Sequence, residues 1–198
     1  MIDGIILASG FSERMGCNKL LLPVGNCVVI ESVIEAAIKA SLNKIFLVYR
    51  EPEIKKSGDK YGLETIENKQ AHLGQAESVK LGVAASKADG YLFIAGDQPF
   101  ITPEFLDSMI SRFNNSGKGV IVPVFNGKIE MPILFSKKYK DQLLLAEGDR
   151  GGFDIIENNP SDVEYFIVDD RKLIADVDTL EEYIWVVNNG IKGDNNGI

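Results

Sequence analysis

The sequence predicts an α/β fold, a three-layer α/β/α sandwich built on a mixed, mostly parallel sheet. Short apolar runs recur along the chain, and between them apolar residues are spaced as on one face of a helix. Strands that alternate with helices in this way pair in parallel and are covered by helices on both faces. With 198 residues, 45% of them apolar, the chain is long enough for one well-buried domain and too short for two.

The predicted strands and helices follow one another in a regular order. Residues 5–7 form an apolar run that suits a strand buried on both faces, and residues 91–95 form another. Between such runs, Ala76, Val79 and Val83 recur at helical spacing. The expected strands cover residues 5–7, 45–49, 63–66, 91–95, 119–123 and 132–135, and the expected helices cover residues 30–38, 51–61, 76–83, 103–113 and 180–187.

Two of the predicted helices begin with capping signals. Thr102 stands before Pro103, and a hydroxyl N-cap followed by proline in the first turn is typical of a helix start. Thr179 and Glu182 have the spacing of a capping box, in which each side chain bonds the backbone of the other residue. The apolar residues expected to face inward from this second helix are Leu180, Tyr183, Ile184 and Val187.

A loop of small residues follows the first strand. Residues 8–12 read Ala-Ser-Gly-Phe-Ser, and such a loop lets backbone N–H groups approach phosphate oxygens. Arg14 adds a planar fork of donors and Lys19 adds a point charge. Gly10 and Gly16 do not have the spacing of a GxxxxGK[ST] loop, and no GxGxxG occurs. The residues therefore predict a triphosphate cradle of another type.

The string LASGFSERMGCNK, residues 7–19, resembles the LAAGxSxRMGxxK signature of nucleotidyltransferases with a glycosyltransferase-A-like fold. The continuation KLLLP, residues 19–23, is similar to the molybdenum cofactor cytidylyltransferases within that group. The resemblance implies a Rossmann-like nucleotidyltransferase domain over residues 1–190. The residues themselves predict a disordered tail at residues 191–198. It also implies nucleotide binding by the first loop, through Leu7, Ala8, Ser9, Gly10, Ser12, Arg14 and Lys19.

Asn68, Gly74 and Ser78 match the NxxxxxGxxxS pattern that the same family places between its third strand and the next helix. In the family these residues contact the base and the ribose, so the resemblance adds them to the predicted nucleotide site. Turn and cap chemistry explains the same residue types equally well, because Asn and Gly favour loops and Ser favours helix starts. Both interpretations stay open.

Carboxylates are the expected metal ligands. Asp97 follows a strand, at the sheet edge where ligands bind in open α/β folds, and stands in a GDQP string that the family shares. Asp178 resembles the second acid of the family's DxDTPED element, and Asp176 is the alternative. Either acid could instead only complement a helix dipole. If Asp97 and Asp178 share one ion, their mutual repulsion should destabilise the metal-free protein.

The sequence departs from the family, or stays ambiguous, in its second half. Glu130 and Met131 precede Pro132, where the family has Gly and then His or Asn, so contacts to the second substrate are not predicted from this strand.

Asp149 and Arg150 lie in an EGDRGG string that resembles a family segment closing over the substrate. Contact with a phosphate and a place at a helix N-terminus are equal alternatives for them.

Composition limits the partners. The net charge is −8, with acidic and basic residues interspersed, which argues against nucleic-acid binding through a broad basic face. No apolar run is long enough for a membrane span, and no signal peptide is expected before the first strand, so we expect a cytoplasmic protein. Cys17, Cys27 and His72 cannot form a Cys/His zinc site. Because a metal would then be held by oxygen ligands, Mg²⁺ is the expected cofactor.

The resemblance implies that CMP is transferred from CTP to molybdopterin, a phosphorylated pterin, and that pyrophosphate leaves. Arg14, Lys19 and Asp97 are then the expected catalytic residues, and Asp97 and Asp178 the expected metal ligands. One alternative is an enzyme of the same fold that transfers GMP or uses a sugar phosphate as acceptor. Another is a non-catalytic carrier for a molybdenum hydroxylase, which would not need the pair of acids.

Overall fold

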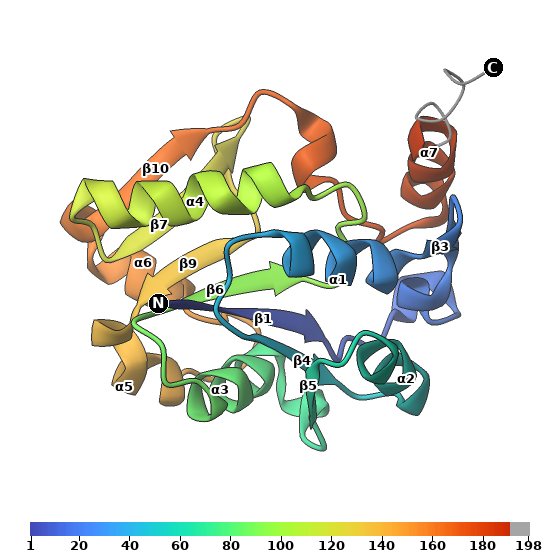
Figure 1. Cartoon of the computed structure of the whole chain (residues 1–198), viewed down its shortest axis with the longest axis horizontal. Helices are drawn as coiled ribbons and strands as arrows, with labels where there is room; N and C mark the ends of the chain where they lie inside the picture. Colours follow the sequence, from blue (N-terminus) through green and yellow to red (C-terminus); the bar gives the residue numbers. More distant parts are fainter. Residues whose placement is uncertain (191–198) are drawn as a thin grey trace.

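A computed structural model describes residues 1–190, and the predicted disordered tail at residues 191–198 lies outside the described residues. Within residues 1–190 one eight-stranded sheet has the strand order β10-β7-β9-β6-β1-β4-β5, with β8 paired to β7. Helices cover both faces (Figure 1). The strands are β1 (Ile2–Ala8), β4 (Ile45–Tyr49), β5 (Glu64–Glu67), β6 (Gly90–Ala95), β7 (Val120–Phe125), β8 (Lys128–Ile129), β9 (Ile133–Ser136) and β10 (Val163–Ile167), and β2 (Pro23–Val24) and β3 (Cys27–Val28) form a separate hairpin.

The sheet is mixed and mostly parallel, as predicted. Strand β1 pairs in parallel with both β4 and β6, so that Ile6 lies opposite Leu47 on one side and Ile94 on the other. Strand β9 runs antiparallel between β6 and β7, and β10 pairs in parallel with β7 at the edge. Consecutive parallel strands need a crossover connection, and helices supply it here.

Two apolar cores lie on the two faces of the sheet. Successive β1 residues point to opposite faces, so Ile6 packs in one core and Ile5 in the other, and both are fully buried. Helices α1, α2, α4 and α7 contribute to the first core, and α3, α5 and α6 contribute to the second. The α-helices are α1 (Val29–Lys39), α2 (Pro52–Lys60), α3 (Gln75–Ala85), α4 (Pro103–Ser116), α5 (Lys140–Leu144), α6 (Phe153–Asn158) and α7 (Leu180–Gly190), and the short 3₁₀ helices are η1 (Glu13–Met15), η2 (Lys19–Leu21), η3 (Ala71–Leu73), η4 (Lys137–Tyr139), η5 (Pro160–Asp162) and η6 (Arg171–Ile174).

Both predicted helix caps are present. The Thr102 hydroxyl accepts a hydrogen bond from the backbone N–H of Phe105 at 3.2 Å, at the start of α4. At the start of α7, the Glu182 carboxylate accepts from the Thr179 N–H at 2.8 Å, and the Thr179 hydroxyl accepts from the Glu182 N–H at 3.2 Å. This reciprocal pair is the predicted capping box.

The predicted inward face of α7 is wrong in part. Leu180 is 63% exposed and Ile184 is 51% exposed, while Val186 is fully buried. Helix α7 lies at the side of the molecule, beside the β2–β3 hairpin (Figure 1), and the Tyr183 hydroxyl donates a hydrogen bond to the carbonyl of Pro23. Val186 is the buried residue of α7 and packs in the first core, and helical spacing alone did not identify it.

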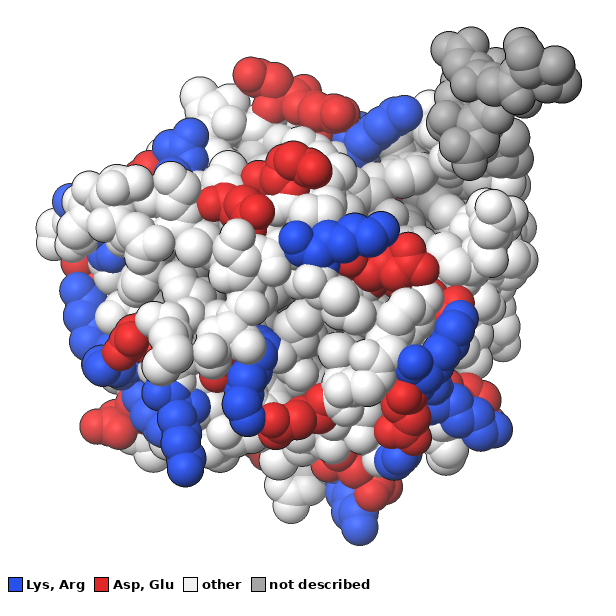
Figure 2. All heavy atoms as spheres, viewed as in Figure 1, with Lys and Arg blue, Asp and Glu red and all other residues white. Residues whose placement is uncertain are grey.

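Charged side chains of both signs cover the surface. On the face shown in Figure 2, Lys and Arg side chains are intermixed with Asp and Glu, as the sequence pattern indicated. Among residues 1–190, no helix has both the length and the apolar character that a membrane crossing requires.

Candidate functional site

The carboxyl ends of β1, β4 and β6 meet at one edge of the sheet because these strands are parallel. The loop after β1 and Asp97 after β6 are therefore neighbours, and the Gly96 N–H donates to the carbonyl of Leu7 at 3.0 Å. The segment before α7 joins them from the far end of the chain. The Val177 N–H donates to the carbonyl of Asp97 at 3.1 Å, which places Asp178 beside Asp97.

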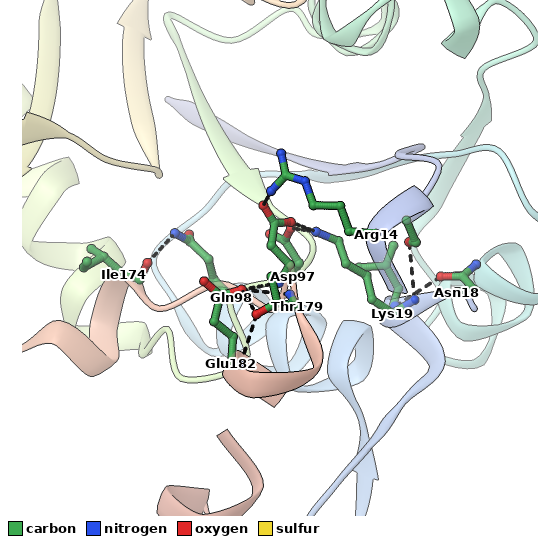
Figure 3. A network of polar contacts seen from close by, with 11 residues as sticks. Arg14, Asn18, Lys19, Asp97, Gln98, Ile174, Thr179 and Glu182 are labelled. Carbon is green, nitrogen blue, oxygen red and sulfur yellow. Dashed lines mark hydrogen bonds and ion pairs between the residues drawn. The ribbon is translucent and has the colours of Figure 1, made fainter. Parts of the chain in front are cut away.

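Lys19 lies between the two carboxylates. Its Nζ donates to Asp97 Oδ2 at 2.5 Å and also to Asp178 Oδ1 (Figure 3). The Lys19 side chain is only 12% exposed. Burial by itself lowers the pKa of Lys19, but the charges and hydrogen bonds of Asp97 and Asp178 outweigh it and leave that pKa above its ordinary value. The predicted repulsion between the two acids is therefore offset in the metal-free protein by an internal cation.

Arg14 completes this charged cluster from outside. Its Nη1 donates to Asp178 Oδ2 at 3.0 Å, and its side chain is 74% exposed. Arg14 thus meets Asp178 rather than the small-residue loop, and it does not line the pocket described below. The structure brings Arg14, Lys19, Asp97 and Asp178 together.

The loop that carries Lys19 is held by local hydrogen bonds. Ser12 has a left-handed backbone with φ 53°, an uncommon conformation for a residue other than glycine, and its hydroxyl accepts from the Lys19 N–H at 3.3 Å. The Asn18 side chain accepts from the Leu20 N–H at 3.1 Å and so caps η2 (Figure 3). These contacts fix the backbone at Lys19 and direct its side chain toward Asp97.

A pocket of about 300 Å³ opens beside this cluster. Four predicted site residues do not line it: Ala8, Arg14, Asn68 and Asp178. The pocket also includes five residues that the sequence did not single out for binding, among them Gln75, which directly follows Gly74. The lining residues are Leu7, Ser9, Gly10, Phe11, Ser12, Lys19, Leu20, Ala71, Gly74, Gln75, Ser78, Ala95, Asp97 and Asp149.

Asn68 lies behind the pocket wall and organises it. Asn68 is 1% exposed, and its Nδ2 donates to Ser78 Oγ at 2.9 Å and to Ser9 Oγ at 3.3 Å. Its Oδ1 accepts from the Gln70 N–H at 3.0 Å. Both serines are also buried and are hydrogen-bonded to each other. This network ties the loop after β1 to the start of α3, so in the described structure Asn68 supports the site through Ser9 and Ser78.

Gly74 allows a second chain segment to close the pocket at α3. Its φ is 111°, and a Cβ there would lie 2.4 Å from the carbonyl carbon of Gly148. The Gly148 carbonyl accepts from the Ala76 N–H, and the Asp149 carboxylate accepts from the Gln75 N–H at 3.2 Å. Of the two predicted roles of Asp149, the structure shows the one at a helix N-terminus, which is that of α3. Asp149 also lines the pocket.

Arg150, the neighbour of Asp149, lies outside the pocket. Its guanidinium pairs with Asp154 at 2.8 Å and with Glu157 at 2.6 Å, and both partners belong to α6. The EGDRGG string thus supplies one pocket residue, Asp149, and one surface arginine, Arg150, which forms two ion pairs with α6. Within residues 1–190, neither Asp149 nor Arg150 forms a hydrogen bond or an ion pair with Lys19.

Arg50 supports the first loop from the end of β4, a role that the sequence analysis missed. Its guanidinium carbon lies 4.0 Å from the centre of the Phe11 ring, and Nη2 donates to the Gly10 carbonyl at 3.4 Å. Because β4 is parallel to β1, its following residue emerges at the same sheet edge. The position of Arg50, directly after the predicted strand at residues 45–49, was the signal in the sequence that could have identified this role.

The residues present fit a divalent metal ion. Within residues 1–190, no group of three or more His, Cys, Asp or Glu side chains is arranged for a metal. Mg²⁺ does not require one, because it is commonly held by one or two carboxylates, water and substrate phosphates. Asp97 and Asp178 already converge on a single cation, Lys19, and supply the oxygen ligands that Mg²⁺ prefers.

Asp176, the alternative metal ligand, lies in a different setting. Partial burial, followed by repulsion from Asp97 and Asp178, raises the pKa of the Asp176 carboxyl to about 6, although the residue keeps contact with solvent. It pairs with no described cation, whereas Asp178 pairs with both Lys19 and Arg14. The geometry therefore favours Asp178 as the partner of Asp97.

Curated relatives include both guanylyl- and cytidylyltransferases. A probable molybdenum cofactor guanylyltransferase of Natranaerobius thermophilus is 33% identical over 132 residues, which are 65% of this chain and 63% of that protein. The match thus spans just under two thirds of that relative. The probable molybdenum cofactor guanylyltransferase of Pyrococcus furiosus is 30% identical over 78% of both chains. The molybdenum cofactor cytidylyltransferase of Escherichia coli K12 is 28% identical over 92% of this chain and 94% of that one.

Solved structures share the fold. A nucleotidyl transferase from Methanothermobacter superposes with a TM-score of 0.84 at 20% identity, over 96% of this chain and 98% of that one. The Mycobacterium tuberculosis protein Rv0371c, in complex with manganese, superposes with a TM-score of 0.79 at 22% identity, over 94% and 98%. The sequence model of the MobA-like NTP transferase domain matches residues 4–163. The chain therefore belongs to the MobA-like NTP transferase family.

Proposed function

We propose that residues 1–190 form a metal-dependent nucleotidyltransferase domain that transfers CMP from CTP to a molybdopterin-type acceptor and releases pyrophosphate. Membership of the MobA-like NTP transferase family supports the reaction class, and relatives named as molybdenum cofactor nucleotidyltransferases support the acceptor. We further propose that the reaction takes place in the cytoplasm and that the product passes to a molybdenum hydroxylase.

One observation carries the proposal. Lys19 Nζ is held between Asp97 and Asp178 at the rim of a pocket whose other wall is the small-residue loop. A preorganised cation of this kind stabilises charge that develops on a leaving phosphate. A carrier without catalysis would have no use for a buried ammonium group shared by two converging carboxylates.

The chemistry needs no covalent bond to the protein. A phosphate oxygen of the acceptor attacks the α-phosphorus of the nucleotide, the bond from that phosphorus to the bridging oxygen breaks, and pyrophosphate carries away the electron pair. Lys19 and Arg14 stabilise the negative charge of the leaving group. Asp97 and Asp178 would hold Mg²⁺, which neutralises phosphate charge when it is bound. The manganese complex of the structural neighbour Rv0371c supports a divalent ion on this fold.

CTP is the nucleotide we propose first. The string at residues 19–23 follows the cytidylyl pattern, and the E. coli cytidylyltransferase aligns over 92% of this chain. The volume of about 300 Å³ is at the lower end for small-molecule sites, which suits a pyrimidine better than a purine. GTP is the second candidate, because the relatives from N. thermophilus and P. furiosus are named as probable guanylyltransferases.

Pyrophosphate release tests the proposal directly. The protein is incubated with Mg²⁺, molybdopterin and each of the four nucleoside triphosphates in turn. We expect CTP to be used and to bind at least about tenfold more tightly than GTP, which corresponds to about 1.4 kcal/mol. Addition of a chelator should abolish turnover. A preference for GTP would establish the second candidate. If none of the four nucleoside triphosphates yields pyrophosphate, the result would favour the non-catalytic carrier.

A further inference from the structure

Strand β10 forms one edge of the large sheet. Within residues 1–190 its only pairing partner is β7, and Figure 1 shows it at the margin of the sheet, next to β7. An edge strand presents unpaired N–H and C=O groups to solvent, and these groups are a template for one more strand. The free side of β10 is therefore a surface on which another chain can pair.

The backbone groups at this free side belong to alternate residues. The Val168 N–H donates to the Val124 carbonyl of β7 at 2.9 Å, so residue 168 and the residues in phase with it turn toward β7. Because the N–H and C=O groups of successive strand residues point to opposite sides, Val163, Tyr165 and Ile167 direct theirs away from β7. These three residues are the ones that can bond to a further strand.

The same three residues form an apolar row. Val163 packs in the second core, so Tyr165 and Ile167, which alternate with it, lie on the same face of the sheet. Tyr165 is 48% exposed and Ile167 is 78% exposed. The strand contains no proline or lysine, and its one charged residue, Glu164, pairs with Arg112 at 2.9 Å. The edge thus lacks the residues that commonly prevent strands from pairing.

The opposite edge of the sheet carries such protection. Strand β5 begins with Glu64 and ends with Glu67, and both residues are exposed. Lys44 pairs with Glu64 at 2.6 Å, and Lys69 pairs with Glu67 at 3.7 Å. Charged side chains of this kind oppose the addition of another strand. An unprotected edge is therefore a property of β10 in particular.

The two ends of β10 carry opposite charges. Near the N-terminal end, Lys118 Nζ donates to the Ser161 carbonyl at 2.8 Å, and Lys118 forms no ion pair within residues 1–190. Asp169 lies just beyond the C-terminal end, is exposed and also forms no ion pair in this range. In an antiparallel pair of β10 strands centred on Tyr165, residue 161 lies opposite residue 169. Each Lys118 would then lie near the Asp169 of the other strand.

Other charges near these ends already have partners. Lys138 pairs with Asp162 at 2.7 Å, and the Arg171 guanidinium lies 5.2 Å from the centre of the Trp185 ring. The charges that remain for a second copy are therefore opposite in sign at the two ends of the strand. This arrangement is complementary to itself in the antiparallel orientation and repulsive in the parallel one.

We propose that β10 pairs antiparallel with β10 of a second copy of this chain, about a two-fold axis that passes through Tyr165. Tyr165 then lies opposite its own counterpart, and Val163 lies opposite Ile167 of the other copy. Each such pair exchanges both backbone hydrogen bonds, and the opposed side chains cover the exposed Tyr165 and Ile167. The contact uses the same surface on both copies, so association stops at a dimer.

Sedimentation equilibrium of the full-length protein, from micromolar to millimolar concentration, measures this association without any turnover. We expect the average mass to rise from that of one chain toward that of two, at the upper end of the range because an interface of one short strand is small. Tyr165→Lys and Ile167→Lys should each raise the dissociation constant at least about tenfold, since they place lysine in the apolar row. Leu145→Lys is the matched control, because Leu145 is also 78% exposed but lies after α5.

Charge reversal tests the antiparallel register. Lys118→Asp and Asp169→Lys should each raise the dissociation constant about threefold or more, and the double variant should restore the wild-type value because it exchanges the two charges. All of these side chains are exposed, and thermal unfolding checks that each variant folds. A single chain at every concentration, a mass above that of two chains, or equal effects of Ile167→Lys and Leu145→Lys overturns the proposal. Weakening by both reversals without recovery in the double variant overturns the register.

Discussion

Lys19 Nζ donates a hydrogen bond to Asp97 Oδ2 at 2.5 Å, although the two residues are 78 positions apart in the chain. The same ammonium group contacts Asp178, so one internal cation occupies the space between the proposed metal ligands. We infer that phosphate oxygens of the nucleotide compete for Lys19 and release both carboxylates toward the metal.

Lys19→Met should reduce pyrophosphate release on the order of 10²-fold, because it removes a preorganised charge aimed at the leaving group. The metal-free variant should also lose about 1–3 kcal/mol of unfolding free energy, since the partly buried Asp97 loses its ion-pair partner and Asp178 keeps only Arg14. Added Mg²⁺ should restore part of this stability. Initial rates and denaturant unfolding with and without Mg²⁺ measure these effects.

Arg14→Ala is the control for stability in that experiment. Its side chain is 74% exposed, and an exposed ion pair contributes about 0–1 kcal/mol. Its unfolding free energy should therefore stay close to that of the wild type. Wild-type rates in Lys19→Met would show that the ammonium group has no catalytic role.

Asp97→Asn and Asp178→Asn should each lower turnover by about 10²-fold or more, since each removes a ligand from the same ion. The turnover of the double variant should be hardly lower than that of the less active single variant, because effects on one shared ion do not add. Steady-state rates over a range of Mg²⁺ concentrations test this. Additive losses would mean that the two acids act independently, and near-normal activity in Asp178→Asn would put Asp176 in its place.

Gly74→Ala should destabilise the fold and weaken nucleotide binding. Its φ of 111° is strained for any other residue, at a cost of about 1–3 kcal/mol, and the new Cβ would collide with the Gly148 backbone. Gly62→Ala is the matched control, with φ 71° and no atom within 4 Å of the added Cβ. Thermal unfolding and CTP titration compare the two. Equal losses of affinity in both variants would contradict a role for the Gly74–Gly148 contact in the pocket.

Asn68→Ala should raise the KM for CTP more than it lowers kcat, because Asn68 positions the loop through Ser9 and Ser78 rather than contacting the reacting atoms. The loss of buried hydrogen bonds should also cost about 1–3 kcal/mol of stability. Asn115→Ala, on the exposed end of α4, is the control. A kcat effect with unchanged KM would indicate a direct part in catalysis.

Features that depend on neighbours in the sequence were predictable. Thr179 and Glu182 cap α7, and Thr102 caps α4, because each cap joins groups three residues apart. The run of Ile5 and Ile6 predicted a strand buried on both faces, since alternate side chains of a strand point to opposite sides. The alternation of strands and helices also predicted parallel pairing, because parallel strands need crossover connections, which helices usually supply.

Sequence patterns predicted which residue types were available for the site, and that the ends of β1 and β6 would bring the loop and Asp97 to one edge. Packing of distant elements placed Lys19 between Asp97 and Asp178 and buried Asn68 behind the pocket. It also decided that Val186, and neither Leu180 nor Ile184, is the buried residue of α7. The physical reason is that a cap or an amphipathic spacing is a local property of the chain, whereas side-chain partners and burial depend on how distant elements pack against one another.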